Sequence, residues 1–77
     1  MTKIRDQEII NAFGKRVKEL RAGKGLSVEA LAARSNIEFR QLYRVENGEI
    51  NPSLSTMNAI AKGLEIPFKD LANLEGF

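Results

Sequence analysis

A chain of 77 residues has room for one domain, and its 12 Lys and Arg against 10 Asp and Glu give a formal net charge of +2. It contains no cysteine and no histidine, which excludes disulfides, a Cys/His zinc site and catalysis by those side chains. No stretch approaches the roughly 20 apolar residues of a membrane-spanning helix, and the polar start MTKIRDQEII is unlike a signal peptide. We therefore expect a cytoplasmic, single-domain protein with no cofactor, metal, membrane contact or enzymatic activity.

The first predicted helix runs from about Asp6 to Ala22 and ends at two nearby glycines, Gly23 and Gly25. Its apolar residues recur at spacings of three and four, which is typical of a helix with one buried side. The residues of this stripe are Ile9, Ile10, Phe13, Val17 and Leu20.

The second predicted helix covers Val28–Arg34 and is followed by a three-residue turn. Ser27 is a suitable N-cap, since its hydroxyl can accept a hydrogen bond from a free backbone N–H of the first helical turn. Ala32 on the apolar side would let a crossing helix approach closely. Asn36 stands in the turn where a left-handed residue is needed, and asparagine tolerates that conformation better than most residues.

The third predicted helix runs from about Glu38 to Glu46, with Gly48 as its stop. On a wheel of about 100° per residue, Leu42, Val45 and Glu46 share one side. The other side carries two guanidinium groups, a phenol and an amide, from Arg40, Arg44, Tyr43 and Asn47. Phe39 and Gln41 lie on the flanks of this side. Such a face is either the solvated side of an amphipathic helix or a surface that can reach the base edges and phosphates of DNA. The helix-turn-helix spacing favours the second interpretation.

Ser53 is the expected N-cap of a fourth helix, and Pro67 begins a short fifth helix that ends near Leu74, with Leu71 in the core. The apolar residues of the fourth helix recur at helical spacing and are also expected in the core: Leu54, Met57, Ile60, Ala61 and Leu64. Further apolar residues exceed what one small helix can bury, and exposed apolar clusters usually mark contact surfaces: Ile66, Phe68, Leu74 and Phe77. We expect these to form a two-fold dimer interface, unless Phe77 folds back onto its own chain.

The run LSVEALAARSNI…LYRVENGEINPSLSTMNAIAKGLEIP resembles the Cro/phage-repressor (XRE-like) helix-turn-helix family. The resemblance extends over about Phe13 to Leu74, and its most specific pieces are Leu26-Ser27, Leu31-Ala32, Arg44-Val45-Glu46-Asn47-Gly48 and Asn51-Pro52-Ser53-Leu54. It implies an all-α, five-helix lambda-repressor-like DNA-binding domain over residues 1–77, with the helix-turn-helix at about 27–48. It also implies that helices at 53–74 serve packing and dimerisation, in a homodimer on a two-fold site in double-stranded DNA.

The resemblance also suggests the roles of individual residues. Arg40, Tyr43 and Arg44 would read or grip the major groove, with Gln41 assisting and Asn47 binding the DNA backbone. Phe39 would either contact a thymine methyl or pack on the preceding helix. Further backbone contacts are expected from the lysines of the first helix and from Lys24, Ser27, Arg34 and Asn51.

An ion pair between Arg21 and Glu46 is expected, because Glu46 falls on the inward side of its helix, where an unpaired carboxylate is costly. In proteins of the resembling family, the residue at the position of Arg21 pairs with this glutamate. Three residues depart from the family pattern, and one of them is Asn36, which replaces the usual Gly in a turn that can accept it. Val28 stands where a phosphate-binding Gln is frequent. Glu38 replaces the usual Ser or Thr cap, so this end either binds DNA more weakly or selects a particular base.

Charge is uneven along the chain. Residues 1–44 contain ten Lys and Arg against five Asp and Glu, whereas residues 45–77 contain two against five. The basic half includes the first three helices, which are the part expected to meet phosphates, although chance scatter is the alternative explanation. The arm of residues 1–5 is either disordered or follows the DNA backbone through Lys3 and Arg5.

Two functions fit these features. The first is a sequence-specific, homodimeric transcriptional regulator of the repressor type, which has no ligand domain for a small-molecule inducer. The second is an antitoxin or adaptor that uses the same fold and binds another protein through its apolar C-terminal edge. A dimer of the pure protein would favour the first function, and a monomer would indicate a missing protein partner.

Overall fold

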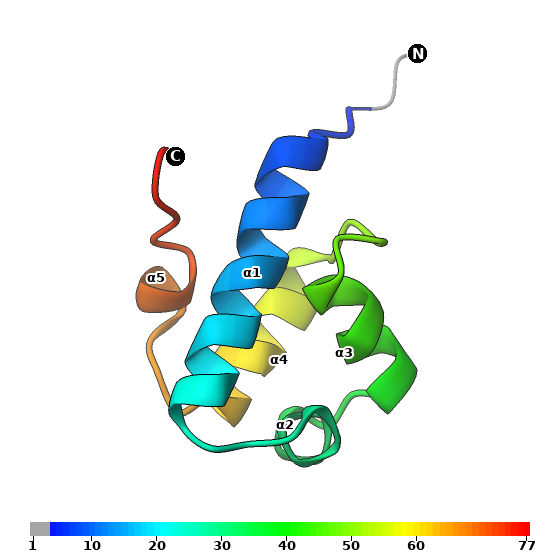
Figure 1. Ribbon diagram of the computed structural model, residues 1–77, viewed down its shortest axis with the longest axis vertical. Helices are drawn as coiled ribbons and strands as arrows, with labels where there is room; N and C mark the ends of the chain where they lie inside the picture. Colours follow the sequence, from blue (N-terminus) through cyan, green and yellow to red (C-terminus); the bar gives the residue numbers. More distant parts are fainter. Residues whose placement is uncertain (1–3) are drawn as a thin grey trace.

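The computed structural model describes residues 4–77, and within that range the chain forms five helices and no strand (Figure 1). The helices are α1 (Gln7–Gly23), α2 (Val28–Ser35), α3 (Phe39–Glu46), α4 (Leu54–Gly63) and α5 (Phe68–Leu71). The predicted all-α, five-helix fold is therefore confirmed. The main difference is that α5 ends at Leu71 rather than near Leu74. The predicted arm contact of Lys3 lies outside the described residues.

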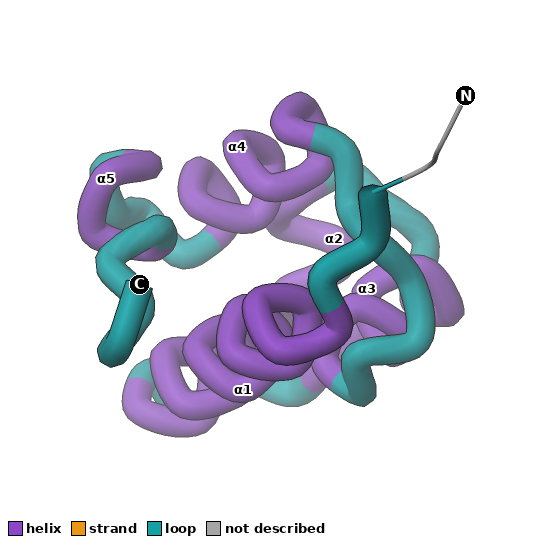
Figure 2. The backbone as a smooth tube through the Cα atoms, turned by 90° about the horizontal axis from the view of Figure 1, so that it is seen from above, coloured by secondary structure: helices purple, strands orange, loops and turns teal. Residues whose placement is uncertain are grey.

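The helices are arranged around α1, the longest of them. In two perpendicular views, α3 lies on one side of α1, and α5 with the C-terminal tail lies on the other (Figures 1 and 2). The shorter α2 packs against both α3 and α4, and α3 packs against α1. Two separate faces of α1 therefore support the rest of the fold.

Side-chain caps begin three of the helices. Asp6 accepts hydrogen bonds from the backbone N–H groups of Glu8 and Ile9 at 3.0 and 3.2 Å. The Ser27 hydroxyl accepts from Ala30 N at 3.0 Å, and the Ser53 hydroxyl accepts from Thr56 N at 3.1 Å. The predicted caps Ser27 and Ser53 are therefore confirmed, and each satisfies a backbone donor that the helix itself leaves free.

The turn between α2 and α3 has the predicted left-handed residue. Asn36 adopts φ 56° and ψ 41°, and its N–H donates to the carbonyl oxygens at the end of α2. Glu38 occupies the N-cap position of α3 without any side-chain cap hydrogen bond, as expected of a poor capping residue. The first backbone N–H groups of α3 therefore donate no hydrogen bond to the side chain of their N-cap residue.

The hydrophobic core lies between α1, α2, α4 and α5, with one side of α3 closing it. Its buried residues are Phe13, Val17, Leu31, Ala32, Leu42, Val45, Ile60, Ala61, Leu64, Leu71 and Leu74. Two close helix contacts depend on glycine. A Cβ at Gly14 would collide with backbone carbonyl oxygens at the end of α3, and a Cβ at Gly63 would collide with the buried Ser35.

Three apolar residues lie elsewhere than predicted. Leu54 was expected in the core but is 67% exposed, because the four-residue α5 is too short to cover the first turn of α4. Ile9 is 37% exposed, because the first turns of α1 extend past the other helices (Figure 1). Leu74 was expected on an exposed dimer surface but is only 9% exposed, since the segment after α5 that carries it packs against the core.

No helix within residues 4–77 has the length and apolarity needed to cross a membrane. The same residues contain no group of three or more His, Cys, Asp or Glu side chains that could hold a metal ion.

Candidate nucleic-acid interface

The two sides of α3 differ sharply in burial. Leu42, Val45 and Glu46 are buried, as the helical wheel predicts. The opposite side is open to solvent and presents the predicted residues Arg40, Tyr43, Arg44 and Asn47. We call this set the exposed face of α3. It offers guanidinium, hydroxyl and amide groups, which are the groups that bind base edges and phosphates.

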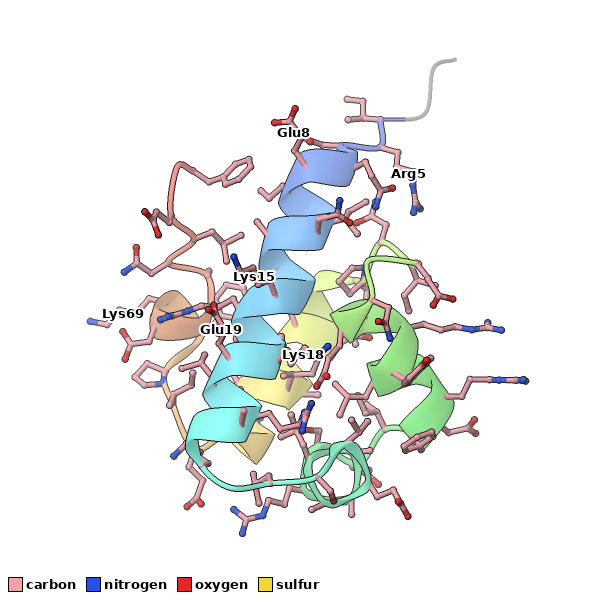
Figure 3. The ribbon with its side chains drawn as sticks, in the orientation of Figure 1. Arg5, Glu8, Lys15, Lys18, Glu19 and Lys69 are labelled. Atoms are coloured by element: carbon pink, nitrogen blue, oxygen red, sulfur yellow. The ribbon has the colours of Figure 1, made fainter. Side chains whose placement is uncertain are left out.

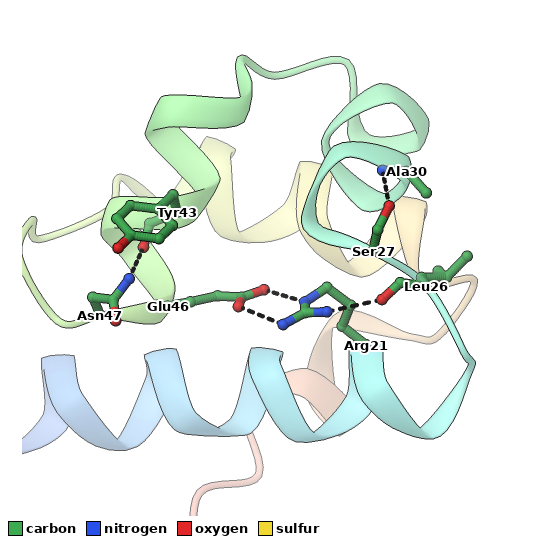
Figure 4. Close-up of polar contacts among 7 residues, drawn as sticks. All are labelled: Arg21, Leu26, Ser27, Ala30, Tyr43, Glu46 and Asn47. Carbon is green, nitrogen blue, oxygen red and sulfur yellow. Dashed lines mark hydrogen bonds and ion pairs between the residues drawn. The ribbon is translucent and has the colours of Figure 1, made fainter.

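A buried ion pair joins α3 to α1. The Arg21 guanidinium donates to both carboxylate oxygens of Glu46, from Nε at 2.7 Å and from Nη2 at 3.0 Å. Its third hydrogen bond runs from Nη1 to the Leu26 carbonyl oxygen at 2.8 Å (Figure 4). The side chains are 14% and 3% exposed, so the expected pair exists and is largely removed from water. Such bidentate contacts fix orientation as well as distance.

Phe39 stacks on Tyr43 at the start of α3. The ring centroids are 6.1 Å apart with an interplanar angle of 19°, and each residue is 49% exposed. Phe39 therefore rests against its own helix and keeps about half of its surface open. The stacked rings form an apolar area beside the charged groups, of the kind that can contact a thymine methyl.

Other predicted contact residues already bond within the protein. The Gln41 amide donates to the Thr56 hydroxyl at 3.3 Å in a partly buried position. The Asn47 amide nitrogen donates to the Tyr43 carbonyl at 2.7 Å, which leaves its oxygen directed elsewhere. Arg34 forms an ion pair with Glu65 at 3.2 Å, but both side chains are well exposed. Among the residues predicted to contact DNA from α3, Gln41 is therefore the one whose side chain is bonded to α4.

The remaining predicted contacts surround α3 at the surface. Lys24 and Asn51 are exposed, and the hydroxyl of Ser27 serves as the cap of α2. Lys15 and Lys18 of α1 border a polar hollow of about 300 Å³ that reaches the end of α3, with Lys18 projecting toward α3 (Figure 3). The side chains lining that hollow include Asn11, Lys15, Lys18, Glu46 and Asn47.

One group of contacts beside α3 was not predicted. Arg5, Gln7 and Asn11, at the start of α1, bond to the turn that ends α3 or to one another. The sequence carries only a weak signal for it, namely two amides four residues apart, a spacing at which side chains on one helix face meet. Nothing in that spacing identifies the partner residues, which lie more than 40 positions away.

The fold and this site define a helix-turn-helix domain: a capped α2, a left-handed turn, and an α3 with one side buried and the other exposed. The comparison with known families agrees, because residues 17–71 match the helix-turn-helix family HTH_3. The chain belongs to this family, and the resemblance to XRE-like proteins is confirmed.

Related proteins include two bacterial regulators. The HTH-type transcriptional repressor RghR of Bacillus subtilis is 30% identical over 69 residues, covering 88% of this chain and 51% of that protein. The HTH-type transcriptional regulator DdrOP3 of Deinococcus deserti is 38% identical over 61 residues, covering 79% of this chain and 46% of that protein. The chain thus spans about half the length of the curated relatives it matches.

Solved structures show the same fold. The restriction-modification controller protein C.AhdI from Aeromonas hydrophila superimposes with a TM-score of 0.78 at 39% identity, covering 80% of this chain and 94% of that one. An HTH_3 family transcriptional regulator from Vibrio cholerae superimposes with a TM-score of 0.83 at 31% identity, covering 87% of this chain and 38% of that one.

Proposed function

We propose that the protein is a transcriptional regulator that binds duplex DNA sequence-specifically, with α3 in the major groove. The main support is the division of α3, because its apolar side and Glu46 are buried while Arg40 and Arg44 are exposed. A helix anchored in this way presents its polar side in a fixed orientation, which base recognition requires. This function would place the protein in the cytoplasm.

The residues of α3 divide into base and backbone contacts. Arg40 and Arg44 can bond two acceptors of a guanine at once, or a phosphate. Tyr43 and Phe39 form the apolar area that would lie against a thymine methyl. Asn47 would accept or donate at the backbone through the part of its amide that Tyr43 does not use.

Contacts to the DNA backbone would come from around α3. Lys24, Ser27 and Asn51 are exposed at the ends of helices or in loops. Arg34 would exchange Glu65 for a phosphate at little cost, because exposed ion pairs contribute at most about 1 kcal/mol. Gln41 becomes a minor contact, since Thr56 already holds its amide.

We propose a homodimer through a revised apolar surface. Leu54 and Phe77 are exposed, and Phe68 borders two shallow hollows of about 330 and 320 Å³. A protruding leucine beside a hollow on one surface is self-complementary, as a two-fold contact between identical chains requires. The interface would then consist of Leu54, Phe68 and Phe77 with Ile66 at its edge, and Leu74 would support it from within the core.

Selection of bound sequences from a random duplex pool at fixed salt tests the DNA-binding proposal. We expect one enriched two-fold site, and Arg40→Ala or Arg44→Ala should abolish enrichment while the protein stays folded. Affinity should fall with salt at a log–log slope near −0.9 per phosphate contact, for roughly 6–10 contacts in a dimer. Unchanged enrichment in both variants would contradict the assignment of α3.

The oligomeric state separates the regulator from the antitoxin or adaptor alternative. Light scattering on the pure protein should give the mass of a dimer. A monomer that binds DNA weakly would instead favour the alternative, in which the apolar surface formed by Leu54 and Phe68 accepts a different protein.

A further inference from the structure

The turn that ends α3 is held by residues at the start of α1. The Gln7 amide nitrogen donates to the Gly48 carbonyl at 2.8 Å and to the Asn11 amide oxygen at 2.9 Å. The Arg5 guanidinium donates to the Glu49 carbonyl at 3.3 Å and to the Gln7 amide oxygen at 3.2 Å. Arg5 lies beside the segment between α3 and α4, whereas Glu8 points to the other side of α1 (Figure 3). We call Arg5, Gln7 and Asn11 the N-terminal network.

The turn leaves no free space against α1. Gly48 has φ +69°, a left-handed conformation that favours glycine. A Cβ at this position would collide with the Asn11 amide oxygen and would lie 3.5 Å from Gln7 Nε2. The Glu49 N–H also donates back to the Arg44 carbonyl at 2.9 Å. The turn is therefore fixed both by the end of α3 and by the N-terminal network.

The polar groups of Gln7 are used within the protein. Its two amide hydrogens have two acceptors, the Gly48 carbonyl and the Asn11 side chain, and its oxygen accepts from Arg5. An amide with two donors and one carbonyl oxygen has little further capacity for a ligand. Gln7 is thus suited to hold the turn and unsuited to bind DNA directly.

The chain reaches Asn51 only three residues after Gly48, and Ser53 then caps α4. The direction of the backbone at Gly48 and Glu49, together with the packing of Ile50 against the core, therefore sets where the exposed Asn51 lies relative to α3. Contacts to the DNA backbone set the register of a DNA-binding helix in the groove. A change in the turn would displace this contact while the core stays packed.

We propose that Gln7, supported by Arg5 and Asn11, is a positioning residue for DNA binding: it fixes the turn Gly48–Glu49 and thereby the placement of Asn51 against the DNA backbone. This inference rests on the proposed function, since it assumes that the exposed face of α3 and the following loop bind DNA together.

The test compares Gln7→Ala with wild type, using the full chain and a duplex selected from the random pool. Fluorescence anisotropy at several salt concentrations gives the dissociation constant and the salt slope. We expect roughly tenfold weaker binding, the equivalent of one lost hydrogen bond, with an unchanged salt slope, because the neutral Asn51 amide displaces no counterion from the DNA. Asn73→Ala, which removes an exposed amide after α5, is the matched control and should bind like wild type.

A double-variant comparison separates positioning from a general loss of stability. Asn51→Ala should weaken binding about as much as Gln7→Ala, and the double variant should bind no more weakly than either one, because both remove the same contact. Asn11→Ala keeps the bond from Gln7 to Gly48 and should show a smaller loss. This variant replaces Gln7→Ala if that protein does not fold, as judged by urea denaturation.

Wild-type binding by Gln7→Ala, or losses that simply add to those of Asn51→Ala, would overturn the positioning role while leaving the proposed function intact. If the wild-type protein enriches no duplex at all, the proposed function fails, and the role of Gln7 fails with it.

Discussion

Arg21→Ala removes the guanidinium group that joins α1 to α3 through Glu46. The change deletes three hydrogen bonds, two to the Glu46 carboxylate and one to the Leu26 carbonyl. It also leaves the Glu46 carboxylate, only 3% exposed, without its partner. Removing one member of a buried pair costs about 3–5 kcal/mol, because the remaining charge is neither hydrated nor neutralised. Small domains have a total unfolding free energy of about 5–15 kcal/mol, and 77 residues lie toward the lower end.

The loss is measured by urea denaturation followed by circular dichroism, with the free energy of unfolding extrapolated to water. Two variants serve as controls. Arg34→Ala breaks a pair whose side chains are 49% and 73% exposed, and it should cost at most about 1 kcal/mol. Arg21→Met combined with Glu46→Leu removes both charges and should be clearly more stable than Arg21→Ala, since apolar replacement of a buried pair is often close to neutral.

The reasoning would be refuted by a loss below about 1 kcal/mol for Arg21→Ala. It would also be refuted if the double variant were as unstable as Arg21→Ala. In that case the missing hydrogen bond to the Leu26 carbonyl, which both variants lack, would explain the loss rather than the stranded carboxylate.

Three further changes test other contacts. Gly14→Ala should destabilise the protein by about 1–3 kcal/mol in urea denaturation, because the added Cβ forces α1 away from the α3 carbonyl oxygens; a neutral result would mean that the helices separate freely. Glu65→Gly should raise stability by about 0.5–1 kcal/mol in the same assay, because Glu65 has φ 59° and glycine relieves that strain despite its greater unfolded-state entropy; a loss would indicate that the ion pair with Arg34 outweighs the strain. Leu54→Gln should leave the folded monomer intact, since Leu54 is 67% exposed, but should shift sedimentation from dimer to monomer; an unchanged dimer would exclude this interface.

Local signals in the sequence predicted most of the fold. Ser27, Asn36 and Ser53 have the predicted capping and turn geometry because those roles depend on one side chain and its near neighbours. The Arg21–Glu46 pair was also predicted, but only the inward position of Glu46 came from its own helix, and the family resemblance supplied Arg21 as the partner. By contrast, periodicity places Leu54 on the apolar side of α4 but carries no information about whether another helix reaches that turn.

The sequence predicted which residues make up the candidate site, but not which of them form hydrogen bonds within the protein. The wheel identifies which residues of α3 face outward, and their exposure agrees. It does not reveal that Gln41 bonds to Thr56 or that Gln7 bonds to Gly48, because each depends on how two distant elements pack. Which bases and phosphates the exposed face of α3 meets is likewise a property of two molecules, and it stays a prediction.

The eight-residue α3 is too short to hold its own orientation, because isolated helices below about 12–15 residues are marginal in water. Three residues of α1 supply that orientation at intervals of seven, or about two turns: Gln7 bonds the turn after α3, Gly14 admits the α3 carbonyl oxygens, and Arg21 binds Glu46. Seven residues return a helix to nearly the same face, so all three point toward α3. Because α3 also closes the core through Leu42 and Val45, substitutions in this second stripe would shift α3 relative to α1 at a cost in stability, as expected for Arg21→Ala and Gly14→Ala. In the proposed complex with DNA, they would change the orientation of α3 without altering any side chain of its exposed face.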